Sequence, residues 1–92
     1  MRHILVYSSD TGLVDDLRAS ADASTTFLPE TDLDEAIERL ARSSRIDAVI
    51  TDDAAFVAAV REEIPGEIPV HLREEGETPG TTLAALDRAL GG

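Results

Sequence analysis

Short apolar runs alternate with amphipathic segments four times along this chain, and this alternation constrains the fold more than any other feature. The apolar runs suit buried strands and cover residues 3–7, 25–28, 46–51 and 68–72. Each run is followed by a stretch in which apolar positions repeat with helical spacing. Such alternation predicts βαβ units and an α/β fold of three layers around a parallel sheet. Right-handed crossovers give 2-1-3-4 as the expected strand order.

Residue types that start and stop helices mark the boundaries of this pattern. Asp32 and Glu35 have the spacing of a capping box, so a helix is expected to begin there. Asp53 and Thr81 stand where the caps of the third and fourth helices are expected. Pro29 is expected to end the second strand, which is short and polar and is therefore placed at an edge of the sheet.

The length and composition indicate one domain with a small aliphatic core. The chain has 92 residues, which fit a single domain over 1–92, and we expect it to be the N-terminal module of a longer protein. It contains two Phe, one Tyr and no Trp, so aliphatic side chains must fill the core. The absence of cysteine excludes disulfides and thiolate metal sites. No apolar run is long enough to span a membrane, and a cytoplasmic location is expected.

The charge balance is strongly acidic. Nineteen Asp and Glu face eight basic residues, all of them arginine, and the formal net charge is −11. Such a surface repels the phosphates of nucleic acids, so this domain is not expected to bind them. An acidic excess with arginine in place of lysine is typical of proteins from salt-adapted, halophilic cells, because salt screens the self-repulsion.

The third apolar run ends in two adjacent carboxylates, Asp52 and Asp53. In open parallel sheets, ligands bind in the crevice at the carboxyl ends of the strands. Asp52 could therefore bind a metal or accept a phosphoryl group, or it could be solvated while Asp53 caps the next helix. Residues 8–10, which follow the first strand, are expected at the same rim.

The segments Ile4-Leu5-Val6, Glu35-Ala36-Ile37-Glu38-Arg39-Leu40 and Asp47-Ala48-Val49-Ile50-Thr51-Asp52, in this order, resemble the receiver domain of two-component response regulators, which has a flavodoxin-like fold. The resemblance implies that Asp52 accepts a phosphoryl group from a sensor histidine kinase. It also implies a Mg²⁺ site formed by Asp10, Asp52 and Asp53. The polar side chains expected nearby are Ser8, Ser9, Thr51 and Arg73.

The chain also departs from the receiver pattern. Ser8 and Ser9 stand where receivers carry an acidic pair, and Arg73 stands roughly where they carry a hydroxyl residue. The fifth βα unit of the family and its lysine have no counterpart. We therefore expect a degenerate receiver-like domain with no enzymatic activity, which acts in signalling through protein–protein contacts.

Two alternatives remain open at this point. Residues 6–12 resemble the hydroxyl-rich loop that binds the FMN phosphate in flavodoxins, although Asp10 would place a negative charge in that loop. The other alternative is an interaction module without phosphorylation. Lacking a fifth strand, the fourth strand has an open side, and this edge or the flank of the third and fourth helices is expected to form a homodimer or an interdomain contact.

Overall fold

The structure, a computed structural model, describes residues 2–10, 12–21, 23–43, 45–64 and 68–91. Its elements in chain order are β1 (Arg2–Tyr7), α1 (Leu13–Ser20), β2 (Thr25–Glu30), α2 (Leu33–Arg42), β3 (Ala48–Thr51), α3 (Ala54–Glu63), β4 (Val70–Leu72) and α4 (Pro79–Ala89). The four strands form one parallel sheet in the order β2-β1-β3-β4. The predicted α/β class and strand order are confirmed, and the fold is a flavodoxin-like (βα)4 arrangement.

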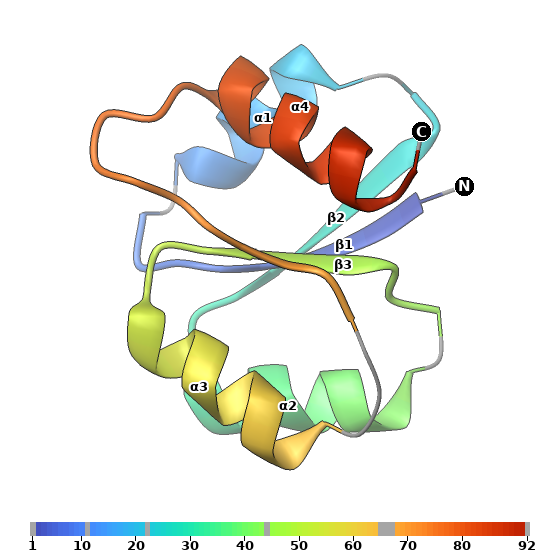
Figure 1. The fold of residues 1–92 in the computed structure, drawn as a ribbon, viewed down its shortest axis with the longest axis vertical. Helices are drawn as coiled ribbons and strands as arrows, with labels where there is room; N and C mark the ends of the chain where they lie inside the picture. Colours follow the sequence, from blue (N-terminus) through green and yellow to red (C-terminus); the bar gives the residue numbers. More distant parts are fainter. Residues whose placement is uncertain (1, 11, 22, 44, 65–67, 92) are drawn as a thin grey trace.

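The sheet forms the middle of three layers (Figure 1). Helices α1 and α4 cover one face, and α2 and α3 cover the other. Successive strand residues point to opposite faces, so each strand contributes to two cores. Ile4 and Val6 of β1 pack in the core beneath α1 and α4, whereas Leu5 packs in the core beneath α2 and α3. This two-sided burial explains why the strands are apolar runs rather than alternating ones.

The cores are aliphatic, as the composition predicts. Phe56 is the largest fully buried side chain and lies in the core beneath α2 and α3. Its ring stacks on Tyr7 with the ring centroids 4.3 Å apart. Phe27 lies in the opposite core. The aromatic rings therefore serve packing on both faces of the sheet.

Pro29 does not end the second strand, and this expectation was wrong. β2 continues to Glu30, and Pro29 pairs in register with Val6 of β1. The Arg2 amide donates to the Ser24 carbonyl at 2.9 Å, so alternate residues from Ser24 onward face β1. Pro29 is not one of these residues, so its backbone nitrogen faces away from β1. Because proline has no N–H to donate, it is tolerated on this open edge.

The fourth helix begins earlier than expected. Thr78, not Thr81, is its N-cap, and the Thr78 hydroxyl accepts from the Thr81 amide at 3.2 Å. Pro79 occupies the first turn, where its fixed φ suits a helix and no N–H is needed. The prediction failed because Thr78 and Thr81 are both acceptable caps, and the proline between them decides for Thr78.

The helices are short compared with the width of a lipid bilayer. The longest, α4, has 11 residues, whereas a membrane-spanning helix needs about 20. Within the described part of the chain, no helix has the length and apolar character needed to cross a membrane.

Candidate functional site

The carboxyl ends of β1 and β3 lie side by side, as the sequence predicts. Tyr7 and Thr51 are register partners in adjacent parallel strands. Just beyond them, the Ser8 hydroxyl donates to Asp52 Oδ2 at 2.7 Å, and the Asp10 amide donates to Ser8 Oγ at 3.0 Å. Residues 8, 10 and 52 therefore share one rim of the sheet.

The buried side chain of Thr51 connects the carboxyl ends of β1 and β3. It is fully buried, and its hydroxyl donates to the Tyr7 carbonyl at 2.8 Å. The same oxygen accepts from the Asp53 amide at 3.1 Å. With its hydrogen-bonding groups used in this way, Thr51 positions the site and does not face a ligand.

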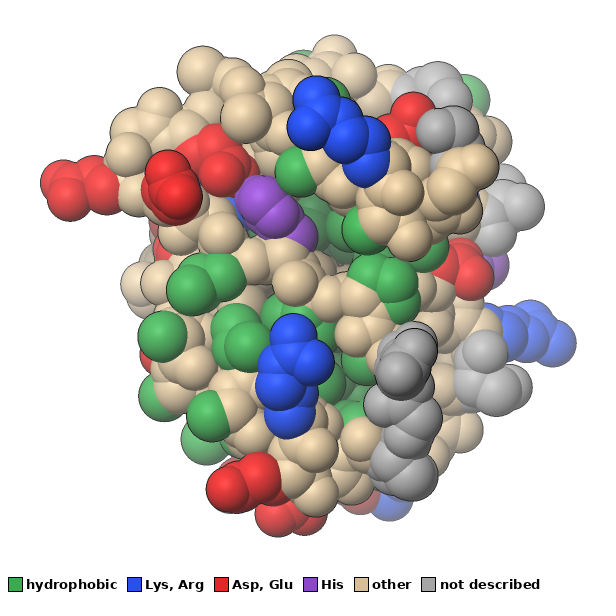
Figure 2. Space-filling view, viewed as in Figure 1, with side chains coloured by type: hydrophobic (Ala, Val, Ile, Leu, Met, Phe, Trp, Pro, Cys, Tyr) green, Lys and Arg blue, Asp and Glu red, His purple; other side chains and the backbone are tan. Residues whose placement is uncertain are grey.

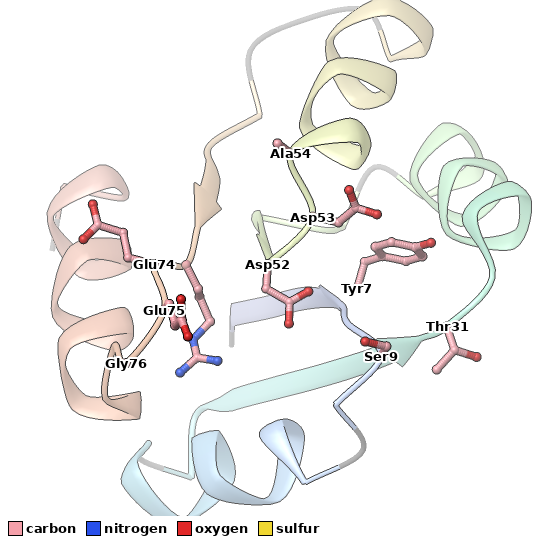
Figure 3. Close-up of a pocket in the computed structure, with 10 residues that line it drawn as sticks. Tyr7, Ser9, Thr31, Asp52, Asp53, Ala54, Glu74, Glu75 and Gly76 are labelled. Carbon is pink, nitrogen blue, oxygen red and sulfur yellow. The ribbon is translucent and has the colours of Figure 1, made fainter.

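Asp53 caps α3, which confirms one of the roles considered for it. Asp53 Oδ1 accepts from the Ala55 amide at 2.9 Å. In Figure 3 the carboxylates of Asp52 and Asp53 point to different sides of the strand end. Asp52 is thus the carboxylate that follows β3 without a local capping role.

Asp10 is also used in a local turn. Its Oδ1 accepts from the Gly12 amide at 2.9 Å. Asp10 lines a cavity of about 220 Å³ beside α1, which Asp52 and Asp53 do not line. Among the described residues, no group of three His, Cys, Asp or Glu side chains is arranged to hold a metal ion. Since two of the three carboxylates have other roles, the Mg²⁺ site of Asp10, Asp52 and Asp53 stays a prediction from the resemblance.

Asp52 opens onto a cleft at the carboxyl edge of the sheet (Figure 3). The cleft has a volume of about 640 Å³. Its lining comes from the ends of β1, β2, β3 and β4, and the residues are Tyr7, Ser9, Thr31, Asp52, Asp53, Ala54, Arg73, Glu74, Glu75 and Gly76. Four carboxylates and one guanidinium give the cleft an acidic character, which attracts cations and repels anions.

Arg73 reaches the cleft, but its hydrogen bonds hold the loop before α4. Its Nε donates to Thr82 Oγ1 at 3.1 Å, and its Nη2 donates to the Glu77 carbonyl at 2.7 Å. The Glu77 carboxylate lies 3.8 Å from Arg73 Nε. The charge of Arg73 is therefore balanced largely by Glu77.

Glu77 is not among the site residues expected from the sequence, but it lies at the centre of this group. Its carboxylate contacts His71 Nε2 at 2.8 Å and accepts a hydrogen bond from Thr82. Burial raises the pKa of Glu77, but the hydrogen bonds from Thr82 and His71 and the charge of His71 outweigh burial and hold the pKa below its ordinary 4.5. The sequence signal for this role is Thr82, five residues after Glu77. Thr82 lies in α4, and its hydroxyl donates back to the Glu77 carboxylate in the loop.

The loop after β1 was also considered as an FMN phosphate site. Asp10 lies within this loop, and its carboxylate accepts from the Gly12 amide, so it takes a hydrogen bond that a bound phosphate would accept in such a loop. The Tyr7 ring is stacked on Phe56, which uses one of its faces. Thr11, part of the predicted motif, lies outside the described residues. The FMN alternative stays an untested prediction.

Comparisons with protein-family models, with curated proteins and with solved structures found no match for this chain. The resemblance to receiver domains therefore rests on the sequence pattern alone. The fold and the position of Asp52 are compatible with it.

Proposed function

We propose that this chain is a receiver-like signalling domain that acts through contacts with other proteins, made at the open edge of its sheet. The observation that carries this proposal is the state of β4. It is the last strand of the sheet, and among the described residues no strand pairs with its outer side. An open strand edge offers main-chain groups to another chain.

The hydrogen-bond register shows which groups of β4 face outward. The Pro69 carbonyl accepts from a β3 amide at 2.9 Å, and the Arg73 amide donates to a β3 carbonyl at 2.7 Å. Alternate residues of a parallel strand bond to the same neighbour. The main-chain N–H and C=O groups of Val70 and Leu72 consequently point to the open side, where they can pair with a partner.

A hollow whose lining residues are mostly apolar lies beside this edge. It has a volume of about 590 Å³, and its lining residues are Val60, Arg61, Ile64, Ile68, Pro69, Val70 and Ala89. Figure 2 shows apolar side chains gathered along the sheet edge between α3 and α4. Leu72, at the end of β4, is 41% exposed. Unpaired backbone and apolar surface at one place are typical of a protein-contact site.

Site-specific cross-linking in cells of the source organism tests this proposal. A photoreactive amino acid at position 72 should form a covalent adduct with another protein or with a second copy of the chain. Leu33 at the start of α2 is a matched control, because it is also 41% exposed but lies away from β4. Adducts at position 72 and not at position 33 are expected. Equal yields at both positions, or none at position 72, would contradict the proposal.

A second candidate function is phosphoryl acceptance at Asp52 from a sensor histidine kinase in the cytoplasm. The observation that favours it is the position of Asp52 after the central strand β3, exposed to the cleft. Ser8 donates to Asp52 Oδ2, which holds this carboxylate toward β1. Receivers carry their phosphoacceptor at the corresponding strand end, as the resemblance implies.

An NMR titration with Mg²⁺ and beryllofluoride at high salt tests the second candidate. If Asp52 accepts phosphoryl groups, saturable shifts should centre on the amides of residues 8–10 and 52–53. Asp52→Asn should abolish them, whereas Asp34→Asn, at an exposed carboxylate in the first turn of α2, should preserve them. A spectrum that does not change with both reagents present would reject this candidate and leave the contact function in place.

A further inference from the structure

Three arginines of this acidic chain form no ion pair with another described residue, and two of these three lie on the helices beside β4. The other five arginines form ion pairs, namely Arg2, Arg18, Arg39, Arg42 and Arg73. Arg45, which lines a cavity beside α2, forms no ion pair with any other described residue. Arg61 of α3 and Arg88 of α4 likewise form none, although 19 carboxylates are available in the chain. Both are exposed. Their charges are therefore available to a partner.

Both arginines flank the open edge of β4. Arg61 on α3 lines the apolar hollow, and so does Ala89, the neighbour of Arg88 on α4. Asp87, the residue before Arg88, lines a cavity on the α1 side instead. Figure 2 shows one basic side chain over α3 and one over α4, on either side of the apolar hollow. Each of these helices carries one basic residue.

We propose that this edge binds an extended peptide segment in which apolar and acidic residues alternate, added beside β4 as a fifth strand. This inference rests on the proposed contact function and names the partner. The main-chain groups of Val70 and Leu72 would pair with the peptide backbone. Apolar side chains on one face of the peptide would enter the hollow, and carboxylates would meet Arg61 and Arg88.

A second copy of the chain is a poorer partner for the same edge. A twofold dimer through β4 is self-complementary, so each copy would present the same two arginines across one small interface. Each copy also carries a net charge of −11, so two copies repel each other more strongly at low salt than one copy repels a short peptide with a few carboxylates. Charge complementarity therefore favours an acidic peptide.

An NMR titration of the ¹⁵N-labelled chain tests the inference directly. The probe is an acetylated and amidated seven-residue peptide of alternating glutamate and valine, in buffer of about 0.1 M salt so that charges are only partly screened. Saturable shifts are expected at the amides of Val70 and Leu72. A peptide with lysine in place of glutamate should bind more weakly at these amides, because it faces the two arginines.

Matched charge reversals identify the arginines that matter. Exposed ion pairs contribute little individually, so Arg61→Glu with Arg88→Glu should weaken peptide binding by about tenfold. Arg18→Glu with Arg42→Glu changes the net charge equally on α1 and α2, and it should change the affinity by less than about twofold. An equal loss in both double variants would overturn the inference, as would an absence of saturable shifts at Val70 and Leu72.

Light scattering on the protein alone separates this inference from the proposed function. A monomer that binds the glutamate–valine peptide supports both. A dimer that Leu72→Lys dissociates would overturn the peptide partner and keep the contact function. If the peptide does not bind but cross-linked adducts form at position 72, the peptide partner is likewise overturned and the contact function is kept. Failure of both experiments would overturn the contact function as well.

Discussion

At the scale of single residues, the Thr51 hydroxyl connects β1 to the start of α3. It is fully buried and bonds to the Tyr7 carbonyl and the Asp53 amide. Thr51→Val keeps the shape of the side chain but leaves both backbone groups without this partner. The free energy of unfolding should fall by about 1–3 kcal/mol, the usual loss when a buried polar group loses its partner.

Urea unfolding followed by circular dichroism measures this loss. Thr31→Val is the matched control, because Thr31 is exposed on the wall of the cleft. It should change the free energy of unfolding by less than about 0.5 kcal/mol. Equal effects of the two substitutions would show that Thr51 has no special role.

Adjacent aspartates with different roles give a second residue-scale prediction. Asp53 caps α3, whereas Asp52 is exposed and accepts from Ser8. Asp53→Ala should lower the free energy of unfolding by about 1 kcal/mol, because the Ala55 amide loses its acceptor. Asp53→Asn keeps an acceptor and should largely preserve stability. Asp52→Asn should have little effect, and a larger loss from it than from Asp53→Ala in urea unfolding would contradict the assigned roles.

At the scale of elements, the loop between β4 and α4 depends on the Glu77 carboxylate. The pKa of Glu77 is lower in the folded chain than its ordinary 4.5, so the folded state binds fewer protons than the unfolded state near that pH. The stability that this carboxylate contributes is therefore present above pH 4.5 and is lost as the pH falls through the folded pKa. The partners of this carboxylate are the buried Thr82 and the half-buried His71 and Arg73.

Comparing the wild type with Glu77→Gln isolates this contribution from that of the other acids. The difference in free energy of unfolding between the two proteins should be largest near neutral pH and should shrink as the pH falls below about 4.5. Urea unfolding at several pH values measures it. A difference that stays constant with pH would mean that the Glu77 charge does not stabilise the loop.

The elements also show what local patterns can predict. Buried strands and the Asp32 and Asp53 caps follow from short-range residue types, and the structure confirms them. Pro29 and Thr81 were misassigned because their roles depend on which side of β2 is open and on where α4 starts. Glu77 was missed since its partners come together only when β4 and α4 pack. The site at the carboxyl edge was predictable in position, because parallel strands must end together.

At the scale of the whole molecule, the net charge of −11 should make stability depend on salt. Repulsion among like charges opposes the compact state, and salt screens it. The melting temperature should therefore rise by several degrees between about 0.05 and 1 M NaCl. Replacing Glu62 and Glu63, both exposed at the end of α3, by glutamine should weaken this dependence. A melting temperature that is insensitive to salt would argue against a salt-adapted protein.

The open edge of β4 is the claim on which the proposed function and the peptide partner depend. Amide hydrogen exchange by NMR tests it directly, at a protein concentration where light scattering shows a monomer. The Arg73 amide, which donates to the Thr51 carbonyl, should exchange slowly, whereas the amides of Val70 and Leu72 should exchange quickly. Protection of Val70 and Leu72 equal to that of Arg73 in the monomer would contradict the open edge.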